Sequence, residues 1–149
     1  MKSQILFILL AIVAGAVLPL QAGLNVQLGK SVNQPIFAAF ASFFIGTIGL
    51  LIYLFILKFD FSSITQVKTV SPVVWTAGIL GAFYVAAVII LAPKLGTALT
   101  FVLVVAGQMT VSLVLDHYGL LGLPVKQINW QRLLGVAFLV AGVLLIRRF

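Results

Sequence analysis

Long apolar runs dominate the chain, and prolines, glycines and single polar residues mark their ends. A bilayer core about 30 Å thick requires ~20 apolar residues in a helix that rises about 1.5 Å per residue. Five runs meet this requirement, and we predict spans over residues 4–28, 35–57, 72–92, 95–115 and 131–147. The pattern therefore predicts an all-α, polytopic membrane bundle of five transmembrane helices, forming a single membrane domain over residues 1–149.

Prolines support these boundaries. Pro35 and Pro72 open the second and third runs, where the missing N–H loses no helical hydrogen bond. Pro93 is expected to close the third run, and Pro19 inside the first predicts a kink that frees backbone carbonyls. Lys2 and the apolar stretch after it also match a cleavable signal peptide superficially, but four further spans favour a retained first helix.

Composition agrees with a membrane protein and excludes several functions. The chain is 63% hydrophobic and only 7% charged, whereas roughly a quarter of residues are charged in an average soluble domain. Its nine Lys and Arg residues stand between the apolar runs or at their ends, seven of them singly, as membrane-interface anchors do, so we expect no nucleic-acid partner. With one His, two distant acids and no Cys, we expect no enzyme activity, no metal and no cofactor.

The basic residues divide almost evenly between the two sides of the membrane. Five spans place the chain ends on opposite sides. The N-terminal side then carries Lys2, Lys58, Lys68, Lys126 and Arg132, and the other side carries Lys30, Lys94, Arg147 and Arg148. The positive-inside bias is almost absent, which favours insertion in both orientations. The alternative is that loop charges scatter and that a neighbouring protein or loop length fixes one orientation.

Insertion in both orientations predicts an antiparallel homodimer. Two inverted copies would give ten spans, the arrangement of the inverted repeats in many secondary transporters. Small residues at helical spacing mark the faces where helices approach closely in lipid. We expect this packing role for Ser42, Gly46 and Gly49 in the second run, Gly81 in the third, and Ala137 and Ala141 in the fifth. The fifth run has no polar residue inside it, which suits a dimer or peripheral helix.

Few polar side chains enter the spans, and they are the candidate solute-binding residues. Gln21 and Asn25 are four residues apart on one helix face, where they either cap the carbonyls freed by the preceding proline or line a polar vestibule. Gln108 and Ser112 share a face of the fourth span, and Gln108 lies near its middle, where a polar group should face protein or water. Tyr84 lies inside the third span, and we expect its hydroxyl to meet Gln108 beside a ligand.

Asp116 and His117 follow at the end of the fourth span. They form either an ion-responsive pair at the entrance of a cavity or a local ion pair with Lys126 or Arg132. The segment "GLLGLP" after them is too apolar for a free aqueous loop, so it lies in the headgroup region or folds back against the bundle. No carboxylate lies in the middle of a span, which favours a neutral, zwitterionic or amphipathic solute over a multiply charged cation.

Three segments carry a family resemblance: "PLQAGLNVQLGK", "GILGAFYVAAVIILAPKLGTALTFVLVVAGQ" and "LDHYGLLGLP". In these segments, and over essentially its whole length, the chain resembles the bacterial YdcZ-type inner-membrane family of the drug/metabolite transporter superfamily. The resemblance implies five spans, location in the bacterial inner membrane and antiparallel assembly, and it supplies no substrate. The motif positions are Gln21, Asn25, Gly81, Tyr84, Lys94, Gly96, Gln108, Asp116, His117 and Gly119.

Together, the residues and the resemblance predict a small-solute secondary transporter that works by alternating access as an inverted-topology dimer. Two alternatives from other classes stay open. One is a passive channel formed by an antiparallel dimer, which predicts fluxes far above a transporter's turnover and no counterflow. The other is a non-transporting membrane subunit that stabilises a partner protein.

Overall fold

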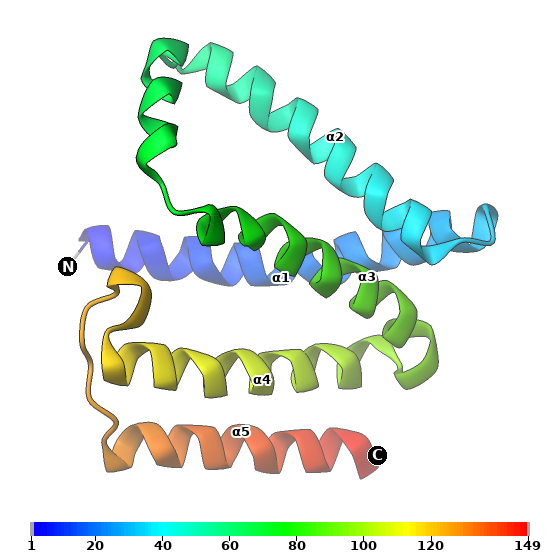
Figure 1. Cartoon of the computed structure of the whole chain (residues 1–149). Coiled ribbons are helices and arrows are strands. Elements are labelled where there is room, and N and C mark those ends of the chain that lie inside the picture. The colour runs from blue at the N-terminus through cyan, green and yellow to red at the C-terminus, as the bar shows by residue number, and fades with distance from the viewer. Residues whose placement is uncertain (1, 149) are drawn as a thin grey trace. The chain divides into compact units, whose positions relative to one another are not determined.

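The computed structural model describes residues 2–148, with all side chains except those of residues 2, 3 and 66. This part of the chain is helical throughout, without strands, which confirms the predicted fold class (Figure 1). The long helices are α1 (Lys2–Ser31), α2 (Pro35–Ile56), α3 (Ala77–Leu95), α4 (Thr97–Tyr118) and α5 (Trp130–Arg148). Short 3₁₀ segments are η1 (Phe61–Thr69), η2 (Pro72–Thr76) and η3 (Leu120–Gly122). Five segments are long and apolar enough to cross a membrane.

The helix ends follow the prolines only in part. As predicted, α2 begins at Pro35, and the Gln34 side-chain oxygen accepts a hydrogen bond from the Ile36 N–H at 3.3 Å. At Pro72 the third run begins as the 3₁₀ segment η2 and becomes α-helical at Ala77. Pro93 does not close α3, which continues to Leu95. The break comes at Gly96, whose φ of 84° suits a residue without a Cβ.

The pattern of contacts along the chain divides it into two compact units, residues 1–94 and 95–149. The first unit contains α1, α2 and α3, and the second contains α4 and α5. A single membrane domain over residues 1–149 remains a prediction.

In the first unit, α1 and α2 form a hairpin that is tightest beside its loop. Asn33 turns the chain with a φ of 52°, and the Gln34 N–H donates to the Gly29 carbonyl at 2.8 Å. Gly29 lies so near α2 that a Cβ there would be 3.2 Å from the Pro35 Cα. Figure 1 shows the two helices separating away from this loop. Residues near the loop are therefore packed, whereas residues further along α2 are open.

Next to this close approach of α1 and α2, side chains of α2 also pack against α3. The buried core consists of Ala38, Ala39 and Ile89, with side chains of α1 and α3 packed around it. Further along, a Cβ on Gly81 would be 3.5 Å from the Phe43 ring, so this glycine lies in the contact between α3 and α2.

The remaining small residues of the predicted packing faces are not in such contacts. A Cβ on Gly46 or Gly49 would meet nothing within 4 Å. Ala137 and Ala141 of α5 are exposed. Their packing roles therefore remain predictions that need a partner outside the contacts described within each unit.

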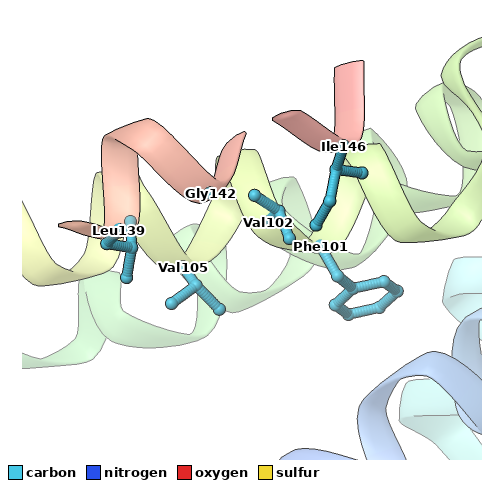
Figure 2. Close-up of a pocket in the computed structure, with 6 residues that line it drawn as sticks. All are labelled: Phe101, Val102, Val105, Leu139, Gly142 and Ile146. Carbon is cyan, nitrogen blue, oxygen red and sulfur yellow. The ribbon is translucent and has the colours of Figure 1, made fainter. Parts of the chain in front are cut away.

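In the second unit, α4 and α5 lie side by side as a helical hairpin (Figure 1). An apolar groove of about 340 Å³ runs between them. Figure 2 shows its lining, which consists of Phe101, Val102 and Val105 from α4 and Leu139, Gly142 and Ile146 from α5. The lining offers no polar side chain that would orient a solute, so this groove is a poor candidate for a polar binding site.

Candidate functional site

A hydrogen bond between two membrane-spanning helices marks the candidate site in the first unit. The Gln21 amide nitrogen of α1 donates to the Ser42 hydroxyl oxygen of α2 at 3.4 Å. The Gln21 donor thus reaches across to α2 rather than back to the carbonyls near Pro19. A bond of this kind between membrane helices contributes about 0.6–2 kcal/mol. Ser42 was predicted only as a packing residue, and it supplies the polar partner as well.

Asn25 lies one turn after Gln21 on the same face of α1. Its side chain is only 7% exposed, and its Nδ2 atom has no hydrogen-bond partner among the described residues. Leaving a buried donor unpaired costs about 1–3 kcal/mol. Native proteins rarely keep such a group without a reason, which makes Asn25 the most informative polar residue of the first unit.

Two cavities adjoin these residues. One, of about 300 Å³, is lined by Gln21, Asn25 and Ser42. The rest of its lining is aliphatic: Val17, Leu20, Leu24, Leu28 and Ile45. A second cavity of about 220 Å³ shares Gln21 and Ser42 and continues along α2 past Gly46. The Gln21–Ser42 pair therefore lies where the two hollows meet, and the unpaired Asn25 amide belongs to the larger one.

The other polar residues predicted inside spans do not line these two cavities. Tyr84 is half-buried in α3 and lines none of these cavities. Gln108 and Ser112 of α4 are exposed, and neither forms a hydrogen bond within the described chain. Tyr84 and Gln108 belong to different units, so their predicted meeting remains a prediction.

The end of α4 carries a network of polar contacts. Asp116 Oδ2 lies 3.2 Å from Arg132 Nη1, so the local ion pair expected as one alternative is present. The same Arg132 nitrogen donates to the Lys126 carbonyl at 3.1 Å. The Ile128 N–H donates to His117 Nδ1 at 3.2 Å. This bond requires Nδ1 to be unprotonated. An ion-responsive role of Asp116 and His117 at an entrance remains a prediction.

The segment after α4 folds back on the helix end. Gly119 has a φ of 60°, and a Cβ there would be 2.6 Å from Val125 Cγ2. The Lys126 N–H donates to the Asp116 carbonyl at 2.8 Å. Leu121, at the tip, is 87% exposed. The base of the loop thus folds back on the end of α4, and an apolar side chain is presented at its tip; location in the headgroup region or against the bundle remains a prediction.

The second acid, Asp60, is also engaged locally and outside the spans. Asp60 begins η1, where its carboxylate accepts the Ser62 N–H at 2.9 Å and the Ser62 hydroxyl at 2.7 Å. These hydrogen bonds lower the pKa of Asp60 below its ordinary value of 3.8. Asp60 is the only acid of the first unit, and no carboxylate lines the cavity beside Asn25.

Comparison with known proteins identifies a family. A family model described as "Putative inner membrane exporter, YdcZ" matches residues 6–145, nearly the whole chain. No curated protein and no solved structure matched the chain.

Proposed function

Because the chain belongs to the YdcZ family of inner-membrane exporters, we propose that it is a secondary transporter that moves a small solute by alternating access between two inverted copies. The family match and the five membrane-length helices make it a multi-pass transporter of the inner membrane. The mechanism, the solute and the dimer are the proposal.

One observation carries the proposal of a solute path. A span of α1 holds a buried, unpaired Asn25 amide next to the Gln21–Ser42 bond, and a cavity of about 300 Å³ adjoins them. Polar groups at membrane depth are costly and should face protein or a water-filled cavity, so a buried amide without a partner beside a cavity supports a solute path. The unpaired amide is difficult to explain for a subunit that only stabilises another protein.

The inverted dimer is supported by charge and by exposure. The basic residues split five to four between the two sides of the membrane, so neither orientation is strongly favoured. Gln108 lies exposed near the middle of α4 without a hydrogen-bond partner in the described chain. An amide at this depth is costly against lipid, and a second copy would supply protein or an aqueous cavity instead. The open faces at Gly46 and Gly49 offer close approach to another helix.

Topology can be tested directly because the chain has no Cys. Val32→Cys and Gln127→Cys place single thiols in loops that five spans put on opposite sides of the membrane. With a membrane-impermeant maleimide on intact cells, we expect each variant to label to about half of its total thiol, because the proposed inverted homodimer requires equal numbers of both orientations. Full labelling of one variant and none of the other would show a single orientation and overturn the inverted homodimer.

The solute path needs a second experiment. Ser42→Cys places a thiol in the cavity lining, and Phe44→Cys places one two residues further on α2, on a nearly opposite helix face. We expect a small water-soluble methanethiosulfonate to modify Ser42→Cys and to leave Phe44→Cys unmodified. Equal protection of both thiols would show that water does not reach the cavity and would favour the non-transporting subunit. Modification of Ser42→Cys at equal rates from both sides at once would favour the channel.

A further inference from the structure

The chemistry around Asn25 specifies what the cavity can hold. We infer that the cavity between α1 and α2 binds a small amphipathic molecule, whose carbonyl or carboxylate oxygen accepts a hydrogen bond from the Asn25 amide and whose aliphatic body lies against the leucines of α1. This inference rests on the proposed transport function and names the substrate class of the same site.

The site calls for a ligand with a hydrogen-bond acceptor, because the unpaired protein group is a donor. Asn25 Nδ2 is buried and has no partner among the described residues. The neighbouring Gln21 donates its own amide hydrogen to Ser42, so that donor is already occupied. The Ser42 oxygen accepts this bond, so it is not an unpaired group. A ligand oxygen near Asn25 would therefore satisfy the one buried donor of this site that has no partner among the described residues.

The lining selects against a cation. No charged side chain lines the cavity, and neither acid of the chain is near it in the sequence or engaged with it. A cationic group placed there would lose its hydration without a carboxylate to replace it. A neutral acceptor has no such penalty, and a carboxylate is favoured over an ammonium because the unpaired group is a donor.

Size and apolar surface describe the rest of the molecule. A volume of about 300 Å³ lies at the lower end of ligand-binding cavities. The five remaining lining residues are all aliphatic. The body of the ligand is accordingly short and apolar, without aromatic or polar groups that this lining would have to satisfy.

Two sources could supply this chemistry: a free solute, and the ester carbonyl of a membrane lipid. The shared chemistry is an acceptor oxygen on an aliphatic body. We assign the site to a free solute, because the cavity adjoins a second hollow through Gln21 and Ser42 and so continues along α2. The experiment below separates the two sources.

The test uses the full chain in lipid nanodiscs with ¹⁵N-labelled side-chain amides. The probe is N,N-dimethylhexanamide, a neutral molecule that only accepts hydrogen bonds, and its matched counterpart is hexylammonium, which only donates. We expect the Asn25 NH₂ resonance to shift and saturate with N,N-dimethylhexanamide and not with hexylammonium. The Gln27 NH₂ resonance is the internal control, since Gln27 lies on another face of α1 and lines none of these cavities. Equal shifts of both resonances would mean nonspecific partitioning and overturn the inference.

Variants test the hydrogen bond itself by equilibrium dialysis of the radiolabelled probe. Asn25→Asp replaces the donor with an acceptor, and Asn25→Leu replaces it with an apolar side chain of similar size. We expect each to bind N,N-dimethylhexanamide about tenfold more weakly, the value of one lost hydrogen bond at a buried site. Gln27→Glu makes the same amide-to-carboxylate change on the other face and should bind as the unmodified chain does. Unchanged binding by Asn25→Leu would overturn the inference even if Asn25→Asp failed to fold.

The lipid arm compares nanodiscs of ester-linked and ether-linked phosphatidylcholine without probe. We expect the Asn25 resonance to be the same in both. A difference between them, together with no probe binding, would place a lipid carbonyl at Asn25 and overturn the assignment to a free solute. Probe binding at Asn25 combined with no aqueous access at Ser42→Cys would instead refute transport and leave the binding site intact, so the two proposals fail separately.

Discussion

The substitution Gly119→Ala is expected to loosen the loop that returns from α4 to α5. Gly119 ends α4 in the left-handed region, with φ 60° and ψ 32°. A Cβ at this position would be 2.6 Å from Val125 Cγ2 and 3.3 Å from the Leu123 carbonyl oxygen. The substitution therefore imposes two separate costs, one on the backbone of residue 119 and one on the contact with the returning chain.

The magnitude follows from these two costs. Holding a residue with a Cβ in the left-handed region costs about 1–2 kcal/mol. Val125 is 64% exposed, so the loop relieves the overlap by moving outward instead of compressing a core. That movement sacrifices the bond from the Lys126 N–H to the Asp116 carbonyl, worth about 1 kcal/mol. We expect a total destabilisation of the loop of about 2–3 kcal/mol, the sum of the two.

The assay is the hydrogen-exchange rate of the Ile128 backbone N–H, which is bonded to His117 Nδ1 in the closed loop and exchanges when the loop opens. A destabilisation of about 2–3 kcal/mol raises the rate roughly 30- to 150-fold. Gly122→Ala is the matched control, because Gly122 also has a positive φ, 77°, but its Cβ would meet nothing within 4 Å. It should show the backbone cost alone. Adding Val125→Ala to Gly119→Ala should recover about 1 kcal/mol, or roughly fivefold in rate.

Equal exchange rates of the Ile128 N–H in Gly119→Ala and Gly122→Ala would refute the reasoning, since the backbone cost would then account for the whole effect. A Gly119→Ala variant that Val125→Ala does not improve would refute it equally, because the 2.6 Å approach is to the Val125 side chain.

Three further predictions follow from the charges and packing faces. Asp60 stabilises η1 as a carboxylate, so its contribution to stability is present at neutral pH and is lost as the pH falls through its lowered pKa. In a ¹³C titration of the Asp60 carboxyl, Ser62→Ala should raise the pKa toward 3.8, because the hydroxyl hydrogen bond is removed. Asp116→Asn removes the ion pair with Arg132, in which both side chains are about one-third exposed. The free energy of unfolding in detergent should therefore fall by about 0.5–1 kcal/mol. The double variant Asp116→Arg with Arg132→Asp reverses the pair and should restore part of this stability. Gly46→Leu should lower the dimer fraction in cross-linking without preventing membrane insertion, because a Cβ at Gly46 would meet nothing within 4 Å among the described residues. An unchanged dimer fraction would remove Gly46 from the interface.

Much of the fold was predictable because each span is encoded within its own segment. The apolar runs and Pro35 predicted the number of helices and the start of α2. Asn33 and Lys58 were not predicted as turning points, although both have a φ of 52°. Asn is enriched several-fold among left-handed residues that are not glycine, so Asn33 carried a signal, whereas Lys58 carried none. The prediction that Pro93 ends α3 was wrong. Proline has a strong tendency to end a helix, yet α3 continues past it to Leu95.

The candidate site was predictable one helix at a time. Spacing placed Gln21 and Asn25 on one face of α1, which agrees with the cavity they share. It did not pair Gln21 with Ser42, because that bond depends on which face of α2 meets α1. A signal was available, since Ser42 is the one polar residue between Pro35 and Gly46. Gln108 is exposed and has no hydrogen-bond partner in the described chain, and helical spacing alone does not predict one.

The position of the titratable groups constrains how transport could be driven. A site built from two amides and a hydroxyl exchanges no proton at neutral pH. A solute bound at Asn25 therefore cannot displace a proton from the site itself, which is how a shared carboxylate couples export to a proton gradient. Asp116 and His117 are engaged in local contacts at the end of α4, Asp116 with Arg132 and His117 with the Ile128 N–H. These residues belong to the second unit and Asn25 to the first, so we expect substitutions at the end of α4 to leave the choice of solute at Asn25 unchanged.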